Sequence, residues 1–405
     1  MKKIVNKVLA VALLATMFGI GGITLFSNYR SLAYAGLRTY TQYLKPDGNV
    51  FDNISARIRS VESIINVNIF SKRFFQLFNA RFQMALGKEM LSFGGTMMVR
   101  LKNGALYDVQ KDADVSLDVE SMVKINENLE KKGIPLVYVY MHSILYEDGL
   151  LPDGVLDFNN KVADDIVKSL RAGGVNTIDS RDIYNTYQFS HGDAMTLDQA
   201  VLRTDQHCAP MMSFAVYAEA VKALNETGKI ALDENATKIE NFTIDVFGGA
   251  HMGDVGARVG ESGVVPDDIP IITPTYETNI KRFSRLTSKD NEEVEGTFRD
   301  AVLNMDILDQ NLPANIYNVY GYQNERTFFT NEALPSGRLL IIKDSFGTPS
   351  ASMMSLASRE VCALDLRKSS DMTIEKMVDE YKPDAVLILH CQEILRGNKN
   401  YVFVD

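Results

Sequence analysis

Residues 338–358 read RLLIIKDSFGTPSASMMSLAS and contain a strand, a turn and a helix in succession. The apolar run at 339–342 is typical of a strand that is buried on both faces. The turn carries Asp344 and Ser345, and a helix rich in small residues follows it. A buried strand joined to a helix in this way is the building unit of an α/β fold, so this stretch decides the fold class.

The same unit recurs along the chain. Residues 117–141 predict a helix that ends near Gly133, and then a β-rich run. Further helices are predicted at 159–171 and 210–227, and further strands at 175–178, 241–247, 360–367 and 385–389. Apolar strands between helices predict an α/β/α sandwich with a mostly parallel central sheet, whose functional groups gather at the carboxyl ends of the strands. Residues 255–335, rich in proline, tyrosine and asparagine, break this pattern and predict a loop-rich insertion.

The amino-terminal residues 1–29 have a different character. Three lysines precede an uncharged run at 8–26, which is just long enough to cross a hydrocarbon core of about 30 Å. The run is longer than the apolar part of a cleavable signal, although AYAG at 33–36 offers a cleavage site. We therefore predict a transmembrane signal anchor, with a cytoplasmic amino end and an extracytoplasmic carboxyl-terminal domain.

Charge divides the rest of the chain into two parts. Residues 30–102 hold 11 Lys or Arg against 4 Asp or Glu, and they predict a basic membrane-proximal stalk. Such a stalk could be simply solvated or could lie near anionic headgroups or wall polymers. Residues 103–405, the main predicted domain, are strongly acidic, which argues against nucleic-acid binding. The three cysteines imply no disulfide framework and form no CxxC or Cys/His zinc pattern, and the sequence predicts no cofactor.

A second informative stretch is RTDQHCAP at 203–210. Asp205 and His207 stand two positions apart, directly before a proline that can open a helix. The pair could be half of a catalytic apparatus, a metal corner, or a buried histidine with a neighbour. With Ser345 it would form a complete set, in which Ser345 is the nucleophile, His207 the base and Asp205 the carboxylate that orients the base.

The tetrahedral intermediate of such a reaction needs donors for its oxyanion. The backbone N–H groups of Ser345 and Phe346 are candidates, because they precede a predicted helix. Gly248 and Gly249, after another predicted strand, are further candidates, because small residues let backbone N–H groups approach a ligand. A plain turn is the alternative interpretation of the two glycines.

Two other residues are candidates for substrate binding. Arg367 follows a predicted strand and could line the pocket or pair with an acid, and His142 follows another strand. A zinc or manganese site built from Asp205, His207 and a third histidine is a further alternative, although no HxxxH spacing supports it.

Four motifs in this order resemble those of SGNH-hydrolase-like proteins of the DHHW type, which are related to the alginate O-acetylation acyltransferases. The motifs are LRTDQHCAP at 202–210, LLIIKDSFG at 339–347, ALDLR at 363–367 and YKPDAVLIL at 381–389. The resemblance covers roughly residues 80–405, and the order Asp, His, Ser is also that of the family. It implies an SGNH-hydrolase-like α/β/α sandwich.

The resemblance further implies serine-dependent transfer of an acyl group, usually acetyl, or ester cleavage on a cell-envelope polysaccharide. It implies a multi-spanning membrane acyltransferase as the partner that supplies the acyl group, and the roles given above for Ser345, His207 and Asp205. Cys208 stands where the family has tryptophan, so an aromatic platform for a sugar is not expected there. A non-catalytic member that binds glycan or scaffolds an export complex remains the alternative, and a metal-dependent hydrolase is a third possibility.

Overall fold

The computed structural model describes residues 69–93, 96–144, 149–189, 192–285, 291–321, 326–369 and 372–391, with scattered residues between 7 and 62. The chain divides into two compact units, Met1–Phe82 and Gln83–Asp405. The first unit contains most of helix α3 (Lys72–Ala85), and the second contains all the strands that the structure describes.

The second unit is built on an eight-stranded mixed sheet. In spatial order its strands are β5 (Asn176–Asp179), β4 (Leu136–Met141), β13 (Ala385–Cys391), β11 (Arg338–Lys343), β12 (Glu360–Leu364), β10 (Arg326–Asn331), β8 (Ile280–Arg285) and β9 (Glu292–Gly296). Neighbours from β5 to β12 run parallel, as predicted. Neighbours from β12 to β9 run antiparallel, so the expected α/β sheet is present but is only partly parallel.

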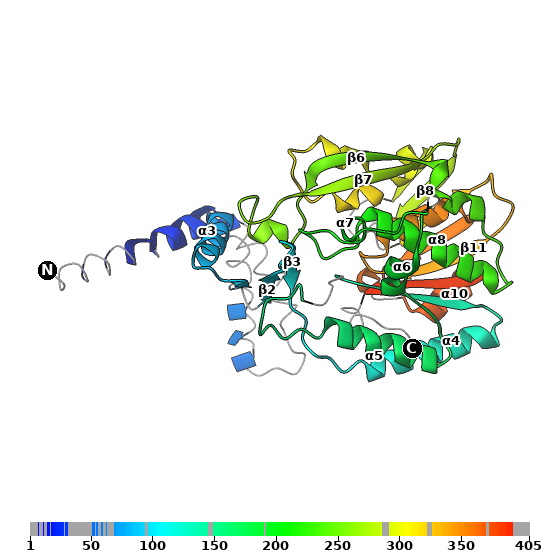
Figure 1. The fold of residues 1–405 in the computed structure, drawn as a ribbon, viewed down its shortest axis with the longest axis horizontal. Helices are drawn as coiled ribbons and strands as arrows, with labels where there is room; N and C mark the ends of the chain where they lie inside the picture. Colours follow the sequence, from blue (N-terminus) through cyan, green and yellow to red (C-terminus); the bar gives the residue numbers. More distant parts are fainter. Residues whose placement is uncertain are drawn as a thin grey trace. The chain divides into compact units, whose positions relative to one another are not determined.

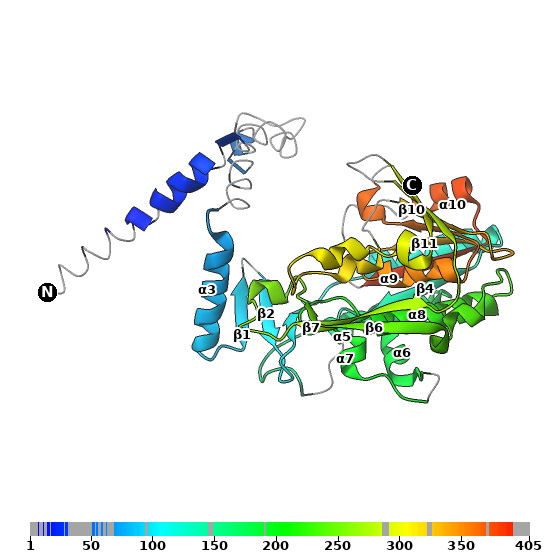
Figure 2. The same ribbon diagram turned by 90° about the horizontal axis from the view of Figure 1, so that it is seen from above.

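Helices cover both faces of the parallel part of the sheet (Figures 1 and 2). The α-helices that lie wholly within this unit are α4 (Ser116–Lys131), α5 (Asn159–Ala172), α6 (Ser180–Thr186), α7 (Leu197–Ala200), α8 (Pro210–Glu226), α9 (Thr348–Met353) and α10 (Ile374–Tyr381). Helices α4 and α5 pack together on one side of the sheet, and α8 packs on β4 and α9 on the other side. The predicted layered sandwich is therefore present around β4, β13, β11 and β12.

Shorter elements connect these layers. A separate antiparallel pair, β6 (Phe242–His251) and β7 (Asp267–Pro274), has an irregular register between Phe247 and His251. Single helical turns are η1 (Glu234–Thr237), η2 (Ile239–Asn241), η3 (Gly256–Arg258), η4 (Phe298–Val302), η5 (Met305–Asp309), η6 (Tyr317–Tyr320), η7 (Met354–Leu356) and η8 (Leu366–Lys368).

The region 255–335, predicted as a loop-rich insertion, instead supplies β8, β9 and β10 of the main sheet. The prediction failed because the buried face of β8 carries Arg282 and Ser284, so its hydropathy does not alternate clearly. The Arg282 guanidinium donates to the carbonyl of Ala301 (2.6 Å), to Ser284 (2.8 Å) and to Glu292 (3.0 Å). These partners satisfy a buried cation that a sequence pattern alone would place on a surface.

Two predictions concern the amino-terminal third. Residues 90–100, predicted as part of the stalk, form β1 (Met90–Phe93) and β2 (Thr96–Arg100), and β2 pairs with β3 (Leu106–Asp108). The predicted anchor lies partly outside the described residues. None of the helices in the described part of the chain is long and apolar enough to span a membrane.

Strand β11 is central, because β13 and β12 flank it and its residues 339–343 are buried. The turn that follows is tied down by Asp344. Its carboxylate accepts from the backbone N–H groups of Phe346 and Cys391, each at 2.8 Å. Gly347 has φ −78°, so it is not needed for a left-handed turn; any Cβ there would collide with Leu389. The turn is therefore held close to the end of β13.

Replacing Ile341 of β11 with alanine should destabilise the protein by about 2–5 kcal/mol, because the side chain is fully buried and a cavity would remain. Ile244→Ala is a matched control, because Ile244 is 40% exposed on β6, and it should cost less than about 1 kcal/mol. Urea unfolding followed by circular dichroism measures both changes. Equal losses would contradict the central place of β11.

Candidate active site

Ser345 lies in the turn between β11 and α9 and is half-buried. The preceding strand ends at Lys343, and the anchored Asp344 fixes the backbone just before the serine. The hydroxyl therefore stands at the carboxyl edge of the parallel strands, where functional groups gather in α/β folds. The Ser345 Oγ lies 2.9 Å from Nε2 of His207.

His207 belongs to the loop that leads into α8, and Pro210 is the first residue of that helix, as the sequence predicts. The imidazole is buried between two aromatic rings. Tyr317 of η6 stacks on it with ring centroids 4.3 Å apart, and Phe346 lies tilted against it at 4.5 Å. The two aromatic rings pack against the imidazole, and His207 contacts polar groups through its ring nitrogens, Nδ1 and Nε2.

Asp205 holds the other nitrogen of His207. Its Oδ1 lies 2.7 Å from Nδ1 and also accepts from the backbone N–H of His207 at 3.2 Å. Burial alone would raise the pKa of Asp205, but the charge and hydrogen bond of His207 and the hydrogen bond of His251 outweigh it and hold the pKa far below its usual range. Since an ionised carboxylate only accepts hydrogen bonds, Nδ1 of His207 carries a proton.

The electrostatics of His207 follow from the same pair. Burial alone would lower the pKa of His207, but the charge of Asp205 and its hydrogen bond to Nδ1 outweigh burial and raise the pKa above its usual value. When the ring is neutral, Nε2 is an acceptor and the Ser345 hydroxyl can donate to it. The three side chains singled out in the sequence therefore form one continuous hydrogen-bonded chain.

His251 also contacts this group, although the sequence assigned it no role. It is fully buried at the end of β6, and its Nε2 lies 3.0 Å from Oδ2 of Asp205. No local spacing reveals the contact, because 46 residues separate His251 from Asp205. The only sequence signal is that a histidine follows a predicted strand.

The loop that carries Asp205 is held by a second buried carboxylate, Asp267, which the sequence also did not reveal. Asp267 accepts from the backbone N–H groups of Arg203 (2.7 Å) and Thr204 (2.9 Å). Gly253 donates its backbone N–H to the Thr204 hydroxyl (3.0 Å), and any Cβ on Gly253 would collide with Asp205. Asp205 is therefore held in two ways: Asp267 binds the backbone of the two preceding residues, and the backbone of Gly253 packs against the Asp205 side chain.

Two of the four predicted oxyanion donors use their N–H groups elsewhere. The N–H of Gly249 donates to Asp268 (2.6 Å), and that of Phe346 donates to Asp344. Gly248 and Gly249 are exposed residues of β6, and Asp268 is the group that a Cβ on Gly248 would approach. Among the described residues, no group accepts from the N–H of Ser345. Helix α9 has only six residues, so its dipole adds little there.

The two predicted substrate-binding residues are engaged elsewhere. Arg367 makes a two-pronged ion pair with Asp365, at 2.9 and 2.7 Å, which is the alternative interpretation given above. His142 is fully buried, with Nδ1 2.7 Å from the Ser180 hydroxyl, so a substrate cannot reach it. Burial lowers the pKa of His142 to about 4.

Cys208 is buried behind the site, where its thiol donates to the carbonyl of His142 (3.2 Å). Burial raises the pKa of this thiol well above its usual range, so the reactive thiolate form is disfavoured. Lys343, next to the turn, is also buried, and burial lowers the pKa of its amine to about 8. Its Nζ donates to the Thr348 hydroxyl at 2.9 Å, which stabilises the start of α9.

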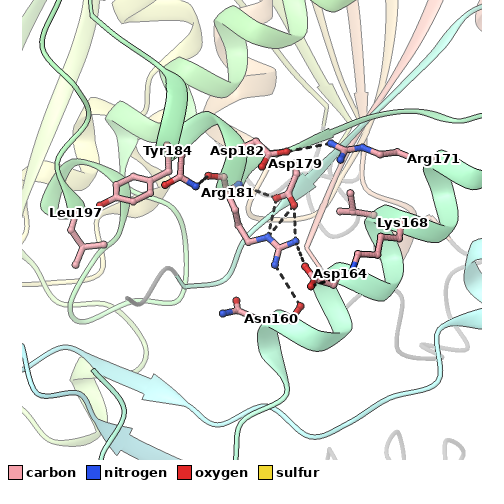
Figure 3. Close-up of a pocket in the computed structure, with 11 residues that line it drawn as sticks. Asn160, Asp164, Lys168, Arg171, Asp179, Arg181, Asp182, Tyr184 and Leu197 are labelled. Atoms are coloured by element: carbon pink, nitrogen blue, oxygen red, sulfur yellow. Dashed lines mark hydrogen bonds and ion pairs between the residues drawn. The ribbon is translucent and has the colours of Figure 1, made fainter. Parts of the chain in front are cut away.

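A pocket of about 570 Å³ lies away from these residues, between α5, β5, α6 and α7 (Figure 3). Its central cation, Arg181, is bound by both oxygens of Asp179 and by Asp164 at 2.9 Å. Arg171 pairs with Asp182 at 3.4 Å. The charges of this pocket are paired with one another, and the pocket is not lined by Ser345, His207 or Asp205.

A metal corner was the other interpretation of Asp205 and His207. Within the described ranges, no three His, Cys, Asp or Glu side chains are arranged to hold a metal ion. Asp205, His207 and His251 instead face one another as acceptor and donors.

Comparison with solved structures identifies the fold. A DHHW family protein from Eubacterium siraeum DSM 15702 matches with a TM-score of 0.54 and 16% identity, over 78% of this chain and 99% of that chain. Bacillus cereus PatB1 with a sulfonyl adduct matches at 0.61 and 11%, over 77% and 100% of the two chains. A second structure of PatB1 matches at 0.58 and 11%, over 76% and 99%.

No family model and no curated protein matches the sequence. At identities of 11–16%, the likeness establishes a shared fold. The resemblance to DHHW-type proteins drawn from the four motifs is thus confirmed at the level of the fold.

Asp205→Asn should lower the pKa of His207, because the raised value depends on the charge of Asp205 while the opposing burial remains. Asp198→Asn, which changes a carboxylate on α7 that does not contact His207, is the matched control and should leave the titration unchanged. An NMR titration of the histidine rings measures both. A His207 pKa in Asp205→Asn at or above that of the unmodified protein would contradict the electrostatic role of Asp205.

Proposed function

We propose that this protein transfers an acyl group, or cleaves an ester, through a covalent acyl-serine on Ser345. The observation that carries the proposal is the chain of contacts from Ser345 Oγ to His207 Nε2 (2.9 Å) and from His207 Nδ1 to Asp205 (2.7 Å). A serine hydroxyl is a weak nucleophile at its ordinary pKa and needs an adjacent base, which in turn needs an orienting group. This arrangement supplies all three.

In the first half of the reaction, neutral His207 accepts the proton of Ser345 while Oγ attacks the acyl carbonyl. The resulting imidazolium then gives that proton to the departing oxygen, and the acyl group stays on Ser345. Asp205 remains ionised throughout and stabilises the imidazolium. The backbone N–H of Ser345 is the candidate donor to the oxyanion.

In the second half, a sugar hydroxyl or water attacks the acyl-serine. His207 accepts the proton of the incoming hydroxyl, and Ser345 leaves with a proton returned by the imidazolium. The chemistry is the same for both acceptors. Transfer and hydrolysis differ only in which acceptor the site admits and orients.

The substrate class rests on the motif resemblance. That resemblance favours an acetyl group, a cell-envelope polysaccharide as the ester-bearing polymer, and a multi-spanning membrane acyltransferase as the donor. An extracytoplasmic location would follow from the predicted anchor at residues 1–29. Cys208 and Tyr317 are both buried, so any aromatic surface for a sugar must come from other residues.

Ser345→Ala should reduce the hydrolysis of an aryl acetate about 10⁴-fold or more, because the nucleophile is lost. It should also abolish labelling by a serine-directed phosphonate. Ser169→Ala, at an exposed serine of α5, is the control and should leave both unchanged. A folded wild-type protein that neither hydrolyses the ester nor takes the label would refute the proposal and favour the non-catalytic alternative.

The pH dependence should identify His207 as the base. His207 must be neutral to accept the Ser345 proton, and its raised pKa keeps it protonated to higher pH. The kcat/KM for an aryl acetate should therefore rise with pH through a pKa above the usual 6.5 of histidine. A profile already flat below pH 6.5 would be inconsistent with His207 as the base.

A further inference from the structure

We propose that His251 is a positioning residue, which holds the Asp205 carboxylate at the angle that keeps His207 directed toward Ser345. The inference rests on the proposed function, because it assigns His251 a part in the same reaction. Its basis is the contact from His251 Nε2 to Oδ2 of Asp205 at 3.0 Å, made by a side chain fully removed from solvent.

Hydrogen-bond directions determine which nitrogen of His251 carries the proton. The backbone N–H of Ile316 donates to Nδ1 of His251 at 3.3 Å, and a backbone N–H can only donate. Nδ1 is therefore an acceptor without a proton, and the ring proton is on Nε2. Nε2–H then donates to Asp205, so Ile316 sets the tautomer that lets His251 serve as a donor.

The carboxylate of Asp205 is thus bound at both oxygens by two different imidazoles. Oδ1 accepts from Nδ1 of His207 at 2.7 Å, and Oδ2 accepts from Nε2 of His251 at 3.0 Å. Rotating the carboxylate about its bond to Cβ would lengthen both bonds at once. With His251 absent, Oδ2 would be a buried anionic oxygen without this donor, and the carboxylate would be held only through Oδ1 and the packing of its loop.

One short segment fixes both imidazoles. Residues 314–317 lie beside the end of β6, where Met252 donates to the carbonyl of Ala314 at 2.9 Å and Ala314 donates to the carbonyl of Ala250 at 3.1 Å. Within this segment Ile316 bonds to His251, and the next residue, Tyr317, stacks on His207 at 4.3 Å. A displacement of this segment would therefore affect the orienting group and the base together.

The test compares His251→Leu with His251→Gln. Leucine has a similar volume and no donor, whereas the glutamine amide can place a donor near the position of Nε2. His251→Leu should lower kcat for an aryl acetate about 10- to 100-fold with little change in KM, the factor expected from one lost hydrogen bond to a buried charge. His251→Gln should stay within about 3-fold of the unmodified protein, since the donor is restored.

An NMR readout separates positioning from packing. With only five histidines in the chain, histidine-labelled protein can be assigned by single variants. The proton on Nδ1 of His207, hydrogen-bonded to an ionised carboxylate, should resonate far downfield. This resonance should weaken or vanish in His251→Leu and persist in His251→Gln. Unchanged kcat and resonance in His251→Leu, or equal losses in both variants, would overturn the proposal.

A third measurement needs no variant and no activity. The ring ¹⁵N–¹H correlations of the unmodified protein should show His251 with its proton on Nε2, and a proton on Nδ1 would overturn the proposal even if His251→Leu fails to fold. If the protein proves inactive on esters, the proposed function fails. The tautomer and the His207 resonance would then still decide whether His251 positions Asp205.

Discussion

An ionised carboxylate that is almost removed from water must have its oxygens occupied by donors, because an unpaired buried charge costs several kcal/mol. Asp205 meets this condition with two imidazoles and a backbone N–H. The donors come from its own loop and from the end of β6. The loop that carries Asp205 must therefore pack against the end of β6. This packing also fixes the position of His207, which belongs to the same loop.

Ser345, the proposed nucleophile, is placed by a different but similar arrangement. Asp344 is fully buried, and its two oxygens accept from the backbone after β11 and from the backbone at the end of β13. Because these strands pair in parallel, their carboxyl ends lie at the same edge of the sheet. Ser345 takes its place from this tie, while His207 takes its place from Asp205. The candidate site is assembled from two separately stabilised halves, 138 residues apart in the chain.

The sequence predicted those parts of the fold whose burial is expressed by apolar residues. Strands β11 and β13 are continuous apolar runs, and the turn after β11 could be recognised as a functional edge. Strand β8 could not be recognised, because Arg282 and Ser284 occupy its buried face and are satisfied by hydrogen bonds that only the folded chain supplies. Buried polar residues interrupt the hydrophobic pattern by which strands are predicted from a sequence.

The same limit explains which residues of the candidate site could be predicted from the sequence and which could not. Asp205 and His207 were accessible to sequence reasoning because they are two positions apart and lie before a helix. His251 and Asp267 were not, because each reaches the motif loop from 46 or more residues away and through atoms whose direction depends on local backbone.

Gly249 was misassigned for a related reason. A glycine predicts that a backbone N–H can approach a partner, but it does not identify that partner as Asp268. The sequence offers no aromatic side chain at Cys208, and the aromatic contacts of the His207 ring come from Tyr317 and Phe346. Since Phe346 directly follows Ser345, and Tyr317 follows Ile316, whose N–H donates to His251, this enclosure links His207 to both halves of the candidate site at once.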